Sequence, residues 1–260
     1  MQLSGKWKLT FFLPLFALLI TACSSQKFTP RTDVLPPASG YLTEQDVLDI
    51  NPTMEVTEED IQDAIKAASS GVFELRTGDR IILVQSGATV PDSVMQEAMM
   101  AHYQVSVYSG IAPVKPRPKL ARKGEIPLEK PEPNYIKTLR LAAAKAKQDK
   151  IIVYWGYLEL GKLDTDNKTV VWQRYLSGDI PSSTKSLRYL IRFALVDVKT
   201  GMWTMYASIN HQDEYMQATF KRYENDVMQV NRVKEASYRL AAQNLANHFD
   251  KPLITAKNTN

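Results

Sequence analysis

Residues 151–160, Ile151-Ile152-Val153-Tyr154-Trp155-Gly156-Tyr157-Leu158-Glu159-Leu160, form a strongly apolar and aromatic stretch. β-branched and aromatic residues dominate it, which predicts a β-strand. The turn-forming run Asp164-Thr165-Asp166-Asn167 follows, and residues 170–176 predict a second strand. The two strands are therefore expected to pair as a hairpin.

Elements of alternating type extend outward from this hairpin in both directions. Towards the N-terminus the sequence predicts strands over 80–84 and 104–108, and helices over 58–70, from Pro91 onward and over 135–148. Towards the C-terminus it predicts strands over 187–198 and 202–209 and a helix over 227–249. This order favours parallel pairing in the first half and antiparallel pairing in the second. We expect an α/β (α+β) fold, a mixed sheet with helices packed on it.

The N-terminus has the layout of a signal peptide. Lys6 and Lys8 precede an apolar run from Leu9 to Ile20, and the tetrapeptide Ile20-Thr21-Ala22-Cys23 ends it. With its cysteine at the cleavage position, the segment resembles the lipobox of bacterial lipoproteins. The resemblance implies cleavage between Ala22 and Cys23, a diacylglyceryl group on the Cys23 thiol, and an acyl chain on the new N-terminus.

Two alternatives are an ordinary secreted protein with an incidental cysteine and an N-terminal transmembrane helix. A spanning helix needs about 20 apolar residues, more than this run supplies. A lone cysteine in a secreted chain would remain an unpaired thiol, and lipidation removes that problem. Ser24 and Ser25 follow the cysteine, where lipoproteins retained at the inner membrane often have Asp. By resemblance, we expect an outer-membrane lipoprotein that faces the periplasm.

Prolines and charges divide the rest of the chain. We expect a signal peptide over 1–22, a lipidated, Pro-rich tether over 23–56, one globular periplasmic domain over 57–250 and a flexible tail over 251–260. A Pro-rich loop within the domain contains a basic cluster, from which we take five residues as candidate partner contacts: Lys115, Arg117, Lys119, Arg122 and Lys123. A loop of this length is usually functional or mobile. The basic cluster is either a solvated surface or a contact for an acidic partner.

Three features occur in the same order as in a known group of envelope proteins. These are the strand 81–84 followed by a helix, the Ala-rich helix leading into the strand that contains Gly156, and the turn Asp197-Val198-Lys199-Thr200-Gly201 before an aromatic strand and a C-terminal helix. The chain resembles the periplasmic α/β lipoprotein fold of LpoB-type cell-wall synthase activators, CsgG-type curli export lipoproteins and the TolB N-terminal domain. The resemblance covers roughly residues 80–249 and implies a protein partner. The turn itself also has a local explanation, because Asp accepts turn hydrogen bonds and Gly tolerates positive φ.

Residues for catalysis are few. His102, His211 and His248 lack the spacing of a helical zinc pair, so no metal site is expected. Ser86 follows a strand but lacks the flanking glycines of a nucleophile elbow, and His211 fits a polar connection between elements. An aromatic binding surface could form from five residues, although core packing suits them better: Trp155, Tyr157, Trp172, Tyr175 and Trp203.

The sequence therefore predicts a non-catalytic lipid-anchored lipoprotein that binds or regulates an envelope protein complex. No cofactor is expected beyond the acyl chains on Cys23, and nucleic acid is not an expected partner of an exported protein. Two alternatives remain. One is an envelope hydrolase that uses Ser86 and His211, and the other is a structural lipoprotein that binds peptidoglycan.

Overall fold

The structure is a computed structural model that describes residues 40–49, 55–69, 71–112 and 134–250. All of them belong to one compact unit. Cys23 and the candidate contacts between Lys115 and Lys123 lie outside the described residues.

The helices are α1 (Glu44–Leu48), α2 (Glu58–Ala68), α3 (Ser93–Met100), α4 (Tyr135–Lys145) and α5 (Arg222–Phe249). The strands are β1 (Arg80–Gln85), β2 (Gln104–Tyr108), β3 (Lys150–Asp164), β4 (Thr169–Arg174), β5 (Thr184–Asp197), β6 (Trp203–Ala207) and β7 (His211–Glu214). This confirms the predicted mixed sheet with helices, in which β1 pairs in parallel with β2 and β3 and the other pairings are antiparallel.

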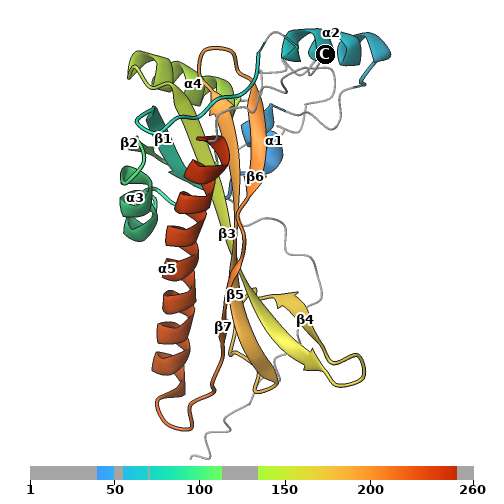
Figure 1. Cartoon of the computed structure of the whole chain (residues 1–260), viewed down its shortest axis with the longest axis vertical. Helices are drawn as coiled ribbons and strands as arrows, with labels where there is room; N and C mark the ends of the chain where they lie inside the picture. The colour runs from blue at the N-terminus through green and yellow to red at the C-terminus, as the bar shows by residue number, and fades with distance from the viewer. Residues whose placement is uncertain (1–39, 50–54, 70, 113–133, 251–260) are drawn as a thin grey trace, which may run out of the picture. The chain divides into compact units, whose positions relative to one another are not determined.

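Two long strands, β3 and β5, run through the whole sheet side by side (Figure 1). At one end β1 pairs with β3 up to Tyr154, and β6 pairs with β5 from Arg192 to Val196. At the other end β4 pairs with β3 from Glu159, and β7 pairs with β5 up to Tyr189. The sheet thus has a β1/β6 half and a β4/β7 half.

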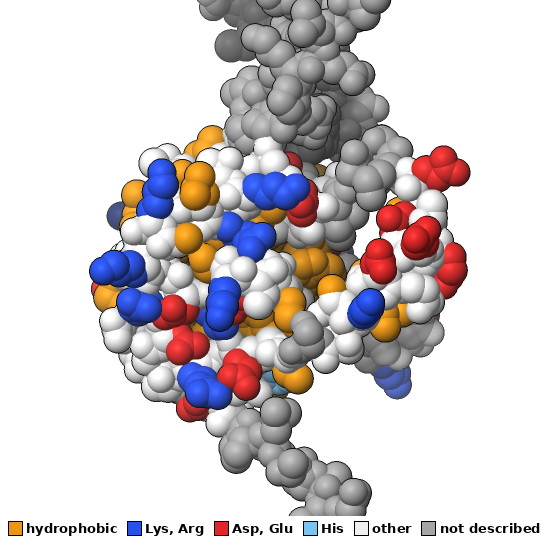
Figure 2. Space-filling model, turned by 90° about the horizontal axis from the view of Figure 1, so that it is seen from above, with side chains coloured by type: hydrophobic (Ala, Val, Ile, Leu, Met, Phe, Trp, Pro, Cys, Tyr) orange, Lys and Arg blue, Asp and Glu red, His pale blue; other side chains and the backbone are white. Residues whose placement is uncertain are grey.

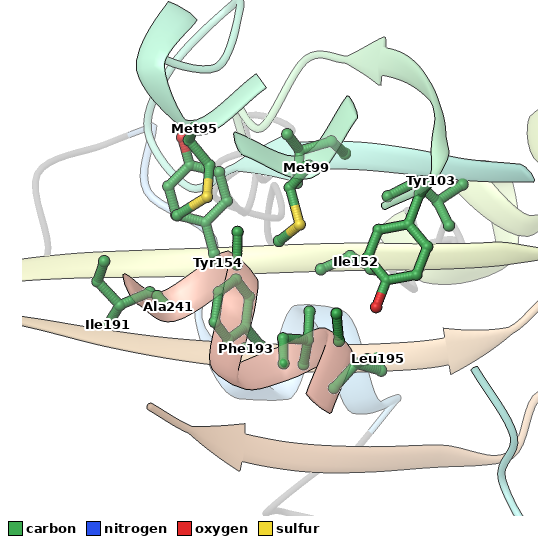
Figure 3. Packing of buried hydrophobic residues seen from close by; sticks show 14 of the residues in the cluster. Met95, Met99, Tyr103, Ile152, Tyr154, Ile191, Phe193, Leu195 and Ala241 are labelled. Atoms are coloured by element: carbon green, nitrogen blue, oxygen red, sulfur yellow. The ribbon is translucent and has the colours of Figure 1, made fainter. Parts of the chain in front are cut away.

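Helices α3 and α5 cover one face of the sheet. Side chains that alternate along β3 and β5, including Tyr154 and Phe193, point into this core together with Met95 and Met99 of α3 (Figure 3). Tyr154 also meets Tyr238 of α5 edge to face, with ring centroids 5.8 Å apart. Because α5 has 28 residues, it continues along the β4/β7 half, where Val233 packs with Leu158, Leu160 and Leu187.

Helices α1 and α4 cover the opposite face in the β1/β6 half only. Leu42, Val47 and Leu48 pack here with Leu139 of α4 and with Trp155. The Trp155 Nε1–H and the Ser86 Oγ–H both donate to the carbonyl oxygen of Leu42, at 2.7 Å and 3.0 Å. The chain is therefore fixed to the sheet from Leu42 onward.

Three elements differ from the expectations. Residues 42–48 were expected in the tether, but they form α1 and its buried approach, because Thr43 supplies a capping box and the apolar side chains after it reach the core. Strand β7 was expected to be a connection. Helix α2 forms over the predicted range with Thr57 as its N-cap, yet none of its residues is buried.

Candidate functional site

Among the residues that the structure describes, no helix packs on one face of the sheet in the β4/β7 half. Tyr157 is the last β3 residue on this face that packs against the α1–α4 core. Beyond it, the register places Glu159 opposite both Arg174 and Arg188, and Gly161 opposite Trp172. Since opposed residues share a face, these side chains gather on the side of the sheet away from α5. We call Tyr157, Glu159, Trp172, Arg174 and Arg188 the arginine–aromatic face.

Trp172 forms a platform at the centre of this face. A Cβ at Gly161 would lie 3.0 Å and 3.1 Å from two atoms of the Trp172 ring, so the glycine leaves room for the indole to lie across the strand. The Arg188 guanidinium carbon lies 4.1 Å from the ring centroid. Arg188 also contacts Glu159, with Nε 2.7 Å and Nη2 2.6 Å from Oε2. This fixes the guanidinium over the ring.

A second arginine–ring pair lies beside the first. The guanidinium carbon of Arg174 lies 4.0 Å from the centroid of Tyr157. Burial raises the pKa of the Tyr157 hydroxyl, while nearby Arg174 and Arg192 act in the opposite direction. At the boundary with the covered half, Arg192 Nη1 pairs with Glu44 Oε1 of α1 at 2.6 Å. With this boundary pair, three arginines and two glutamates lie on this side of the sheet.

This arrangement has the chemistry of a recognition surface. A guanidinium stacked on a ring can still donate its in-plane N–H groups to carboxylates or carbonyls, as Arg188 does to Glu159. Tyr, Trp and Arg are also the side chains enriched at the energetic centres of protein interfaces. The face is suited to bind a protein segment that carries acidic groups.

The opposite end of the sheet has a charged cleft of ≈ 660 Å³, lined by residues that include Glu74, Arg76, Asp79, Lys150 and Asp197. Figure 2 shows side chains of both charges interspersed over this end. Lys150 Nζ lies 2.5 Å from Asp197 Oδ2. Burial opposes ionisation of Asp197, but hydrogen bonds from Lys150 and Thr200 outweigh it and lower the Asp197 pKa. Arg76 pairs with Glu74, Lys150 pairs with Asp197, and Asp79 accepts a hydrogen bond from the Arg76 backbone N–H, so we assign the cleft a structural role.

A polar network lies where β1 ends. Asp92 Oδ2 accepts hydrogen bonds from Tyr238 Oη at 2.7 Å and Gln85 Nε2 at 3.2 Å, and lies 2.7 Å from Lys234 Nζ. Tyr154 Oη donates to Gln85 Oε1 at 2.7 Å. Burial opposes ionisation of Asp92, but its hydrogen bonds to Lys234, Tyr238 and Gln85 outweigh it and lower the pKa. The network ties β1, β3 and α3 to α5.

The two residues of the hydrolase alternative have different partners. The Ser86 side chain is buried against Leu42. His211 lies on β7 opposite Tyr189, and its Nε2 lies 3.2 Å from Asp213 Oδ1. In the described ranges, no group of three or more His, Cys, Asp or Glu residues is arranged to hold a metal ion.

The aromatic residues singled out in the sequence separate into different environments. Trp155 is buried in the α1–α4 core, and Tyr175 packs near the α5 side. Trp203 is partly exposed on β6, and only Tyr157 and Trp172 share the open face. Sequence reasoning missed their arginine partners. The available signal was alternation, because Arg188 and Arg192 occupy the polar side of a strand whose other side is apolar.

Comparison with known proteins identifies a family. The family model described as YafT bacterial lipoprotein matches residues 43–248. No curated protein matches the chain. Because the match covers most of the sequence, the chain belongs to this family of bacterial lipoproteins, which places it in the cell envelope with a membrane anchor. None of the helices in the described part of the chain combines the length and apolar character needed to cross a bilayer.

Proposed function

We propose that this family member is a non-catalytic outer-membrane lipoprotein that faces the periplasm and binds an envelope protein complex. The acylated Cys23 would hold it at the membrane, and the residues after Cys23 would act as the tether. Ser24 and Ser25 support the outer membrane as its destination. The resemblance noted above suggests a cell-wall synthase or a secretion or surface-assembly apparatus as the partner.

The arginine–aromatic face is the observation that carries this proposal. Helix α5 packs on one face of the β4/β7 half. On the other face, the packing of the described helices against the sheet ends near Tyr157. That other face presents the partly buried rings of Trp172 and Tyr157, with arginines held against them. Such preorganised side chains lose little conformational entropy on binding.

In-cell photo-crosslinking tests the face directly. Val170 and Val171 are exposed neighbours on β4 whose side chains point to opposite sides of the sheet, and Val170 lies opposite Leu163 on the arginine–aromatic side. A photoreactive residue at 170 should give a discrete protein crosslink, and one at 171 should give much less. Equal yields from both positions would contradict the assignment.

Charge reversal supplies a second test. Arg174→Glu should reduce crosslinking from position 170 at least about tenfold, as expected for loss of an interface arginine worth roughly 1.4 kcal/mol or more. Arg76→Glu, an exposed arginine beside the charged cleft, is the matched control and should leave the yield unchanged.

The basic cluster from Lys115 to Lys123 remains a second proposed contact. Deleting residues 115–130 should leave the thermal unfolding temperature nearly unchanged and abolish partner capture. Capture that survives this deletion would remove the loop from the proposal.

Two measurements separate the alternatives. Retention on purified sacculi, without a protein crosslink, would favour the structural peptidoglycan-binding lipoprotein. A hydrolytic activity lost in both Ser86→Ala and His211→Ala would favour the envelope hydrolase, with folding checked because Ser86 is buried.

A further inference from the structure

Most of the most exposed apolar side chains of the described chain belong to two segments that a hydrogen bond joins at the start of α5. Five large apolar residues in the described ranges have exposed fractions between 74 % and 78 %: Leu176, Ile209, Met216, Phe220 and Tyr223. All except Ile209 come from the segment after β4 or from the β7–α5 connection and the first turn of α5. We call Leu176, Met216, Phe220 and Tyr223 the α5 tip.

The backbone that carries the α5 tip is held in place. Tyr175 and Tyr215, which immediately precede Leu176 and Met216, pack in the same core cluster. The Arg222 guanidinium donates to the carbonyl oxygen of Ile180 and so joins the two segments. Gln229 of α5 exchanges hydrogen bonds of 3.0 Å and 2.9 Å with the Met216 backbone. The exposed side chains therefore belong to a backbone that is held by hydrogen bonds at the start of α5. Figure 1 shows the start of α5 at the end of the molecule that contains β4 and β7.

The composition of the tip is that of a membrane-interface contact. Phe, Tyr, Met and Leu favour the boundary between headgroups and acyl chains, and neighbouring Lys and Arg side chains extend towards phosphates. Lys221 and Arg222 follow Phe220 directly. Lys221 lies 3.5 Å from Glu224 and Arg222 lies 3.9 Å from Asp226, so the local charge is nearly balanced. Insertion would depend on apolar contact more than on anionic lipid.

The length of the chain before the domain allows this contact. Gly40 lies seventeen residues after Cys23, which corresponds to at most about 56–61 Å of extended chain. The chain enters the domain where Tyr41 contacts Gly87, near Gln85 and the Asp92–Tyr238 hydrogen bond. Sixteen residues separate Tyr238 from Arg222 along α5, a rise of roughly 24 Å. The available chain is about twice that distance.

We propose that the α5 tip inserts into the headgroup region of the bilayer that holds the acylated Cys23. The contact would orient the domain with the start of α5 against the membrane. It does not require the arginine–aromatic face to bind a partner, so each proposal can fail without the other.

Depth-dependent fluorescence quenching tests the contact in the lipidated full-length protein. Acylation blocks the thiol of Cys23, the chain's single cysteine, so Thr219→Cys supplies one site for a polarity-sensitive bimane label and keeps all four tip side chains. In vesicles of phosphatidylethanolamine and phosphatidylglycerol, the label should shift to shorter wavelength and be quenched by doxyl lipids. Raising the salt concentration or omitting phosphatidylglycerol should change the quenching less than twofold.

Two controls make the result decisive. Asn210→Cys, beside the equally exposed Ile209, should show several-fold less quenching. Replacing Leu176, Met216, Phe220 and Tyr223 by serine should remove the quenching at 219 while circular dichroism remains native. Equal quenching at 210 and 219, or none at 219, would overturn the proposal. A wavelength shift that appears only when envelope proteins are added would assign the tip to a protein partner and would also overturn it.

Discussion

Gly201 illustrates how one residue can satisfy two constraints at once. Its φ of +78° confirms the expectation that the Asp197–Gly201 turn needs a glycine for positive φ. A Cβ at this position would also lie 2.6 Å from Arg140 Nη1, and Arg140 donates to the Val198 carbonyl oxygen. The first constraint can be inferred from the turn sequence. The second depends on α4 packing against the turn, which the sequence does not reveal.

Gly201→Ala should therefore destabilise the domain for both reasons. A residue forced into this backbone region costs about 1–3 kcal/mol, and displacement of Arg140 adds to that. Urea denaturation should show a larger loss than for Gly178→Ala. Gly178 also has positive φ, +96°, but a Cβ there meets nothing within 4 Å. Equal losses in the two variants would show that Arg140 moves aside without cost.

The lowered pKa of the Asp92 carboxyl predicts that its contribution to the free energy of unfolding depends on pH. Its folded-state pKa is lowered, so its contribution is present above the unfolded pKa of about 3.9 and is lost as the pH falls through the lower folded value. Asp92→Asn should be less stable than wild type at pH 7, because Lys234 loses its partner. The difference should shrink below about pH 4.

Urea denaturation between pH 7 and pH 2.5 measures this effect. Asp166→Asn, in the exposed β3–β4 turn, is the matched control and should differ little from wild type across the range. A stability difference for Asp92→Asn that stays constant down to pH 2.5 would contradict the assigned role.

At the scale of elements, strong apolar periodicity was enough to predict most of the secondary structure. The predicted strands correspond to β1 through β6, and the predicted helices correspond to α2 through α5. Strand β7 was missed because His211-Gln212-Asp213-Glu214 has no apolar alternation, and it forms because β5 offers a partner edge. Helix α1 was missed because it has only five residues and depends on packing against α4.

Helices α2 and α4 should respond very differently to truncation of an apolar side chain. Leu139 of α4 is buried, whereas Ile65 of α2 is exposed. Leu139→Ala should cost about 2–5 kcal/mol of unfolding free energy, and Ile65→Ala should stay within about 0.5 kcal/mol of wild type. Chemical denaturation of the two variants checks this. A large loss for Ile65→Ala would mean that α2 packs against a surface in solution.

At the scale of the molecule, the unequal cover of the two sheet faces could not be predicted from sequence. Alternation in β5 indicates that one side is apolar and the other polar, but not that α5 follows the full sheet while α1 and α4 stop near Tyr157. The pairing of Trp172 with Arg188 depends on the β3–β4–β5 register. Residues 20–23 alone, in contrast, predict a lipid anchor at Cys23, and the family match supports a lipoprotein.

Removing the proposed acylation site should change where the protein is located in the cell but not whether it folds. Cys23→Ala removes the proposed acylation site but leaves the core of the domain unchanged, so the protein should fold and should not reach the outer membrane, its proposed location. Cell fractionation with urea denaturation of the purified variant measures both properties. Full function in cells from this unanchored form would contradict the proposed role of the membrane attachment.

The double hydrogen bond to the Leu42 carbonyl also has a mechanical consequence. Tension along the chain from Cys23 would act on the hydrogen bond between the Ala112 N–H and the Gly40 carbonyl oxygen, and then on Trp155 and Ser86 at Leu42, before it could reach β1 along the backbone. Leu42, Val47 and Leu48 would have to leave the core before that load could reach β1. The start of the domain would thus distribute such a load between β3, which contains Trp155, and the α1–α4 core, so that movements of the membrane would not pull on β1 alone.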